Sequence, residues 1–180
     1  DPTGSAVTAL ALPMIFGGMA SAVVFSRVFK NSRAKQLIGA LGVAILGGLV
    51  ASSILYFGFD ALEANFWPTT GVIILGIAAI STTVLGLNSL LGIAGLGLGA
   101  VTMLFISNPL SGMATGMHWL PSPWGAIGQY LPLGAAGTAL RSSAFFDGAG
   151  MTNSVIVLLC WIIAGITLAA VGAWRARRTR

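Results

Sequence analysis

The chain alternates between long apolar stretches and short polar segments. The apolar stretches contain five segments that are each long enough to cross a lipid bilayer as a helix. A transmembrane helix needs roughly 20 mostly apolar residues for a hydrocarbon core about 30 Å thick. The pattern therefore predicts an all-α integral membrane protein, with residues 1–180 forming a single transmembrane domain. The predicted transmembrane helices cover about residues 5–26, 36–59, 69–88, 90–107 and 153–174.

Two stretches need closer interpretation. From Thr69 to Ser107 the chain stays apolar for too long for one crossing, so we expect two helices with a turn near Asn88, Ser89 and Gly92. Residues 108–141 are rich in glycine and contain four prolines, each of which removes a backbone hydrogen bond from a helix. We expect this segment to be re-entrant or to lie at the outer interface, with several tryptophans in an outer aromatic belt.

The few charges indicate the orientation. Eight of the nine Lys and Arg residues fall in two clusters, and the acidic residues lie elsewhere. Because cytoplasmic loops concentrate Lys and Arg, we expect a plasma (inner) membrane protein with its N-terminus outside and its C-terminus in the cytoplasm. The two clusters are Arg27, Lys30, Arg33 and Lys35, and Arg175, Arg177, Arg178 and Arg180.

Composition excludes several classes of function. Hydrophobic residues make up 56% of the chain and charged residues 7%, far from the roughly 25% charged content of a soluble domain. The basic residues flank apolar segments, so they indicate topology and contact with anionic membrane lipids rather than a nucleic-acid partner. No Asp, Glu, Lys or Arg falls inside a predicted span, which argues against a proton relay or a charged ion pathway.

The sequence shows no catalytic, cofactor or metal motif. It has no phosphate-binding loop and no zinc-binding His pair, and His118 is the only histidine. The one conceivable nucleophile–base pair, Cys160 with His118, combines a predicted span with an outer loop. We therefore expect a protein that is not an enzyme and holds no cofactor.

Glycines are spread through the predicted helices, where small residues let backbones approach closely. Gly95 and Gly99 form a GxxxG pair and are candidate helix-packing residues, either within the chain or as the seam of a homodimer. Pro13 is positioned to kink the first span.

The order of elements near the C-terminus resembles the last part of the ABC type-2 transporter permeases, especially the YhgE/Pip-like (phage infection protein) branch. In that pattern Ser-Gly ends the penultimate span, proline-marked short helices follow outside, and Leu-Arg precedes the last span. The corresponding residues form a candidate outer gate segment, although the Phe-Pro expected after Ser-Gly is missing. They are Ser111, Gly112, Pro121, Pro132 and Arg141.

The resemblance implies the permease domain of an exporter that moves a lipid-like or amphiphilic substrate with a separate cytoplasmic ATPase subunit. The loop with Arg27, Lys30, Arg33 and Lys35 would then contact the ATPase, or it serves only as a topology signal. Arg141 would pair with Asp147 or meet an anionic lipid or substrate. The alternative function is a noncatalytic membrane anchor or scaffold in a larger envelope or secretion complex.

In the YhgE/Pip-like branch a five-span block follows an earlier span and an external domain. The chain starts with Asp1-Pro2-Thr3-Gly4 and shows neither an initiator Met nor a signal peptide. We therefore expect it to be part of a longer or processed protein.

Overall fold

The computed structural model describes residues 5–59 and 65–179, and every regular element in these ranges is helical. Five helices are long and apolar enough to cross a membrane, as predicted, so the chain has the character of a multi-pass membrane protein. The acidic residues Asp60 and Glu63, between the second and third predicted helices, lie outside the described residues. The five spans are α2 (Ala11–Val28), α3 (Arg33–Phe59), α4 (Phe66–Leu91), the run α5–η1–α6 (Ile93–Leu110) and α9 (Thr152–Arg178).

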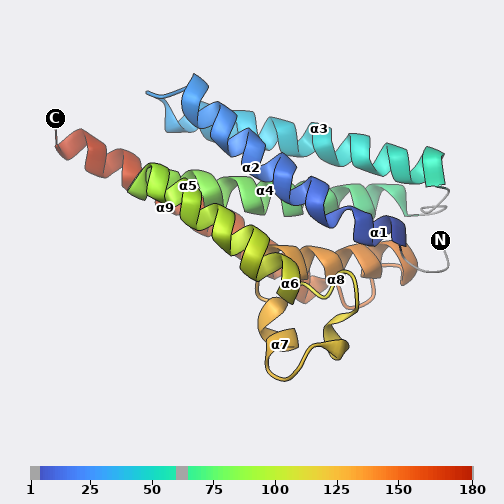
Figure 1. Ribbon diagram of the computed structural model, residues 1–180. Helices are drawn as coiled ribbons and strands as arrows, with labels where there is room; N and C mark the ends of the chain where they lie inside the picture. Colours follow the sequence, from blue (N-terminus) through green and yellow to red (C-terminus); the bar gives the residue numbers. More distant parts are fainter. Residues whose placement is uncertain (1–4, 60–64, 180) are drawn as a thin grey trace.

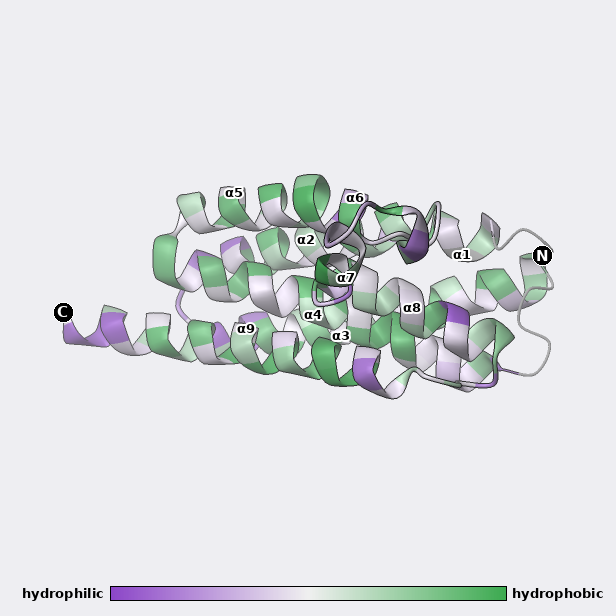
Figure 2. Cartoon of the chain, turned by 90° about the horizontal axis from the view of Figure 1, so that it is seen from below, coloured by the Kyte–Doolittle hydropathy of each residue, from purple (hydrophilic) through white to green (hydrophobic). Residues whose placement is uncertain are grey.

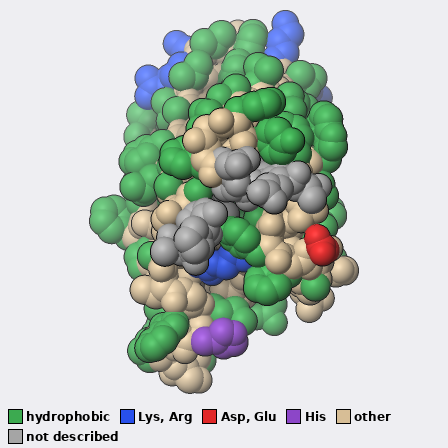
Figure 3. Space-filling view, turned by 90° about the vertical axis from the view of Figure 1, so that its right-hand side faces the viewer, with side chains coloured by type: hydrophobic (Ala, Val, Ile, Leu, Met, Phe, Trp, Pro, Cys, Tyr) green, Lys and Arg blue, Asp and Glu red, His purple; other side chains and the backbone are tan. Residues whose placement is uncertain are grey.

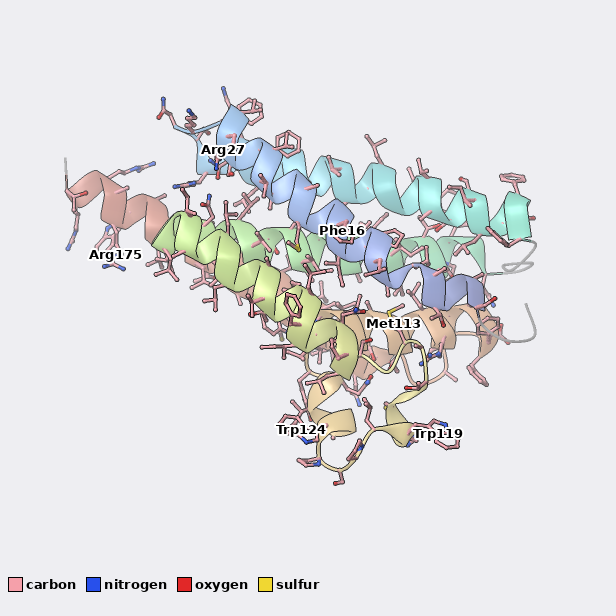
Figure 4. All side chains as sticks on the ribbon, in the orientation of Figure 1. Phe16, Arg27, Met113, Trp119, Trp124 and Arg175 are labelled. Carbon is pink, nitrogen blue, oxygen red and sulfur yellow. The ribbon has the colours of Figure 1, made fainter. Side chains whose placement is uncertain are left out.

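These helices lie side by side in an elongated bundle (Figure 1). The two basic clusters meet at one end, where Figure 4 labels Arg27 and Arg175. We call this the basic end and the opposite end the far end. The short helix α1 (Ser5–Ala9) lies at the far end, whereas α9 finishes at the basic end, as five crossings require.

Helix α4 forms the centre of the bundle, because 78% of its most apolar window is buried, against 39% or less for the other four spans. Its closest neighbour is α9, and glycines make this approach possible. A Cβ on Gly165 would lie 2.5 Å from the Thr82 carbonyl carbon, and one on Gly86 would lie 2.6 Å from the Gly165 oxygen. Ser89 Oγ donates to the Ala169 carbonyl 3.0 Å away and joins the two helices near the basic end.

The first span is interrupted, as its proline predicts. Pro13 has no N–H to give to the carbonyl four residues earlier, and its ring collides with that carbonyl in a continuous helix. That carbonyl belongs to Ala9, the last residue of α1, and α2 begins after Leu10. The kink separates α1 from α2, and α1 lies at the far end of the bundle.

The fourth span starts from Gly92, whose φ of 62° favours glycine and ends α4 at the predicted turn. Its first part, α5 (Ile93–Val101), packs on α4: a Cβ on Gly95 would meet the Leu87 oxygen at 2.0 Å, and one on Gly99 would meet Val84 Cγ2 at 3.0 Å. Both glycines are buried within the chain. They pack inside the protein, and in this arrangement they are not free to form a seam with a second copy.

The span then widens into the π-helix η1 (Thr102–Ser107) before α6 (Asn108–Leu110). At the end of the π-helix, Ser107 Oγ accepts a hydrogen bond of 3.2 Å from the Leu133 N–H, in the first turn of α8 (Pro132–Phe145). Pro132 itself needs no partner, because it lacks an N–H. The π-helix therefore places the Ser107 hydroxyl beside the Leu133 N–H, which has no acceptor within α8.

The run α5–η1–α6 ends before it reaches the far end, and α8 continues beside α4 over the remaining length (Figures 1 and 2). Helix α8 is part of the core, with Leu133, Ala136 and Leu140 among its fully buried side chains. Helix α8 ends at Phe145, beyond residue 141, where the predicted outer segment ends. The fourth crossing is thus a broken one, with residues 111–131 leaving the bundle between its two parts.

Candidate functional site at the far end

The excursion 111–131 contains the short helices η2 (Met117–Trp119) and α7 (Trp124–Gly128) and projects sideways from the bundle (Figure 1). Backbone polar groups at membrane depth must be satisfied by protein, since lipid offers no partners. Side chains of the bundle supply several of these partners. Trp161 Nε1 on α9 donates to the Tyr130 carbonyl at 2.7 Å, and a further hydrogen bond joins two side chains, because Gln129 Oε1 accepts from Thr138 Oγ1 on α8.

The start of the excursion is held by Arg141. This side chain leaves α8 and its Nη2 donates to the Gly112 carbonyl at 3.1 Å and to the Met113 carbonyl. The Met113 carbonyl also accepts from Thr8 Oγ1 on α1 at 2.9 Å. One backbone oxygen therefore joins α1, α8 and the loop after α6.

Arg141 is partly buried and pairs with no carboxylate in the described part of the chain. The alternative in which it pairs with Asp147 is wrong for this structure, because Asp147 Oδ1 accepts from Asn65 Nδ2 at 3.2 Å and Arg141 bonds to the two carbonyls. Neutral carbonyls leave the guanidinium charge uncompensated. Its Nε and Nη1 donate to no described residue, so these N–H groups are left as separate donors for an anionic group.

Arg141 lines a cavity of about 540 Å³ at the far end, which we call the polar pocket. Its other walls carry hydroxyls and an imidazole, from Thr8, Thr138, Ser142 and His118, together with Phe146. Figure 3 faces this end of the molecule and shows the histidine on its lower surface and the acidic side chain to one side. The pocket offers one cation and several hydrogen-bonding groups, which suits an anionic polar group.

A second cavity, the apolar groove, lies between α1, α2, α3 and α4 and measures about 620 Å³. It runs from Val43 to Phe59 on α3, a length of about 24 Å at the 1.5 Å rise of a helix. That is more than half of the roughly 30 Å hydrocarbon core. Val50 and Ile54 are each more than half exposed, so the groove is open toward the surrounding bilayer.

Helix α1 contributes to both cavities. Its Ser5, Ala6 and Ala9 line the apolar groove, whereas Thr8 lines the polar pocket. The two cavities therefore lie on different sides of one short helix. An apolar cavity and a cationic one adjoin at the far end.

The structure gathers only some of the predicted gate residues. Ser111 and Gly112 lie beside Arg141, and Gly112 has the positive φ of 64° that lets the chain turn out of α6. Pro132 is buried at the start of α8, and Pro121 is exposed on the excursion. Trp119 and Trp124 point outward from the excursion and are 83% and 52% exposed (Figure 4).

Sequence reasoning missed Thr8, Gln129 and Trp161. These side chains form hydrogen bonds with other elements of the fold, and such bonds leave no local pattern in the sequence. The predicted partner-contact cations Arg27, Lys30, Arg33 and Lys35 surround the turn between α2 and α3 at the basic end, away from this site.

No group of three or more metal-binding side chains comes together within residues 5–59 and 65–179. Cys160 is exposed on α9 and His118 is exposed in η2, and no hydrogen bond joins them. The geometry therefore offers no support for the conceivable Cys–His pair.

The sequence matches no protein-family model, and no curated protein or solved structure shows significant similarity to it. The resemblance to ABC type-2 permeases accordingly stays a prediction.

Proposed function

We propose that the chain is the membrane-spanning permease domain of an exporter for amphiphiles that carry an anionic group. The observation that supports this proposal is the pair of adjoining cavities at the far end. The apolar groove suits a hydrocarbon tail, and the polar pocket presents Arg141 with unused donors. An amphiphile needs these two environments next to each other.

The proposal includes orientation and energy supply. With the basic end in the cytoplasm of a plasma (inner) membrane, the far end is the outer surface, where an exporter releases its substrate. We assign the energy source to a separate ATPase subunit that contacts the loop with Arg27, Lys30, Arg33 and Lys35. Alternation between two packings of the bundle would move the substrate, as in rigid-body transport mechanisms.

Binding is the first property to test. The chain in detergent micelles is titrated with a fluorescent lysophosphatidylglycerol, and with the matching monoacylglycerol, which lacks the phosphate, as the neutral control. We expect the anionic probe to bind about tenfold or more tightly, since a charge-assisted hydrogen bond contributes about 1.5–3 kcal/mol. Equal affinity for the two probes would contradict the assignment of the polar pocket.

Two variants address the two cavities separately. Arg141→Gln should abolish the preference for the anionic probe, whereas Arg141→Lys should retain part of it because the charge remains. Gly17→Leu should fill the apolar groove and lower the binding affinity of both probes equally. Gly17 lines the groove, and a Cβ at this position meets no atom within 4 Å. Gly42→Leu is the matched control, since Gly42 also has free space but does not line the groove.

The ATPase is tested by mass spectrometry of the proteins that copurify with the chain from its native membrane. A stoichiometric ATPase, lost when the four loop cations are replaced by Gln, is the expected result. Copurification with a large assembly that contains no ATPase would overturn this part and favour the scaffold function.

A further inference from the structure

The basic end contains a third cavity, the basic cleft, which measures about 570 Å³. One wall is the loop between α2 and α3, and the other is the last four turns of α9. The cleft brings together Lys30 and Arg33 from the first basic cluster and Arg177 from the second. Arg177 is more than 140 positions from the other two residues in sequence, so the fold assembles the cationic site.

The loop that forms one wall is held in a defined shape. Gln36 is buried and its Nε2 donates to the Phe29 carbonyl at 2.8 Å, while its Oε1 accepts from Arg33 Nη1 at 3.0 Å. Ser32 Oγ accepts from the Lys35 N–H at 3.3 Å and caps the start of α3. The guanidinium of Arg33 is thereby positioned before any ligand arrives.

The electrostatics of the basic cleft favour an anion. The only acidic side chain among the described residues is Asp147, which lies at the far end. The start of the 27-residue helix α3 brings a partial positive charge to the cleft and the C-terminal ends of α2 and α9 bring partial negative ones, so the three side-chain cations decide its sign. No described carboxylate competes with an incoming anionic group.

The lining changes character along the cleft. Arg177 lies at its charged end, whereas Ile166, Ala170 and Leu37 form apolar walls farther toward the middle of the bundle. Arg177 and Ile166 are separated by about 16 Å along α9, which is close to half of the roughly 30 Å hydrocarbon core. An occupant that fits this lining has an anionic end and a hydrocarbon end of about one leaflet in length.

We infer that the basic cleft binds one anionic phospholipid of the leaflet at the basic end, with its phosphate among Lys30, Arg33 and Arg177 and one acyl chain along Ile166 and Leu37. Cationic pockets between transmembrane helices are a known form of lipid headgroup site. A free phosphate leaves the apolar walls unused, and a soluble acidic protein does not reach them. The lipid joins α9 to the α2–α3 loop, and α3 and α9 otherwise make little direct contact.

Native mass spectrometry of the intact chain tests this inference. The chain in detergent is titrated with phosphatidylglycerol or phosphatidylcholine of the same acyl chains, and the bound lipid is counted. We expect one retained phosphatidylglycerol, and an affinity about 100-fold lower for the triple variant Lys30→Gln, Arg33→Gln, Arg177→Gln, since each cation near the surface changes binding about fivefold. Excess inorganic phosphate should not displace the lipid.

The matched control is Arg27→Gln, Arg175→Gln, Arg178→Gln, which removes the same charge from the same end but none from the cleft lining. It should keep the affinity within a fewfold of the unaltered chain. Equal losses in the two variants would overturn the inference, because net charge alone would then explain binding. Displacement by inorganic phosphate, or loss of a copurifying protein in the cleft variant with lipid affinity unchanged, would overturn it as well.

Discussion

Replacing Gly165 by alanine should separate the two helices that form the centre of the fold. The added Cβ would lie 2.5 Å from the Thr82 carbonyl carbon, 2.6 Å from its oxygen and 2.7 Å from the Thr83 nitrogen. An ordinary contact begins near 3.4 Å, so α4 and α9 must move apart locally by roughly 0.9 Å. The neighbouring atoms belong to a helix backbone and cannot rotate away, unlike the end of a flexible side chain.

Overpacking of a well-filled interior costs typically 1–3 kcal/mol, and a backbone clash belongs at the upper end of this range. We therefore expect Gly165→Ala to lower the free energy of unfolding by about 2–3 kcal/mol. The assay is equilibrium unfolding in mixed dodecylmaltoside–SDS micelles, followed by circular dichroism. The shift corresponds to a roughly 30-fold or larger change in the folded-to-unfolded ratio.

Gly42→Ala is the matched control, because a Cβ at Gly42 in α3 meets no atom within 4 Å. Alanine is the better helix former by about 1 kcal/mol, so this variant should be neutral or more stable. If Gly165→Ala unfolds at the same SDS fraction as Gly42→Ala, the close α4–α9 packing is wrong, and with it the central place of α4.

Three further predictions concern individual side chains. Ser89→Ala should lower the free energy of unfolding by about 0.6 kcal/mol, the average for a hydrogen bond between transmembrane helices. Ser52→Ala should be neutral or stabilising, because the buried Oγ of Ser52 has no described partner. Unfolding in SDS measures the stability of both variants. Ser107→Ala removes the acceptor at the start of α8 and should cost about 1 kcal/mol, with faster amide exchange in α8 as the local measurement. In a cysteine-free background, a membrane-impermeant thiol reagent applied to intact cells should label Thr115→Cys and not Ala176→Cys, and the opposite pattern would reverse the orientation.

Most of the helical framework was predictable because crossing a bilayer imposes a length and an apolar composition on each helix. The turn at Gly92 and the kink at Pro13 were predictable for a related reason: each has a backbone property that the local sequence reveals. The meeting of the two basic clusters at one end followed from the number of crossings. These features depend on local sequence or on counting.

Helix α8 was not predictable in the same way. Prolines and glycines suggested a segment outside the core, but Pro132 occupies a first-turn position where proline is tolerated, and the helix that follows packs against α4 and α9. The bonds of Arg141 to Gly112 and Met113 depend on the orientation of that helix. The sequence suggested Asp147, or an anionic lipid or substrate, as the partner of Arg141, and gave no sign of the two backbone carbonyls that it contacts.

The distribution of ionisable groups connects the proposed substrate with the lipid site. A charge in the hydrocarbon core is costly, so cations of a membrane protein gather where polar partners are available. Here the cations of the basic end line a cleft with an apolar extension, and Arg141 at the far end lines a pocket beside an apolar groove. Both sites suit a ligand that has an anionic group next to a hydrocarbon chain, but they differ in the number of cations that attract it. In the two proposals, three cations hold a lipid at the basic end, whereas Arg141 alone binds the substrate at the far end. Weak binding at the far end suits a site that must release its ligand, and strong binding at the basic end suits a lipid that stays.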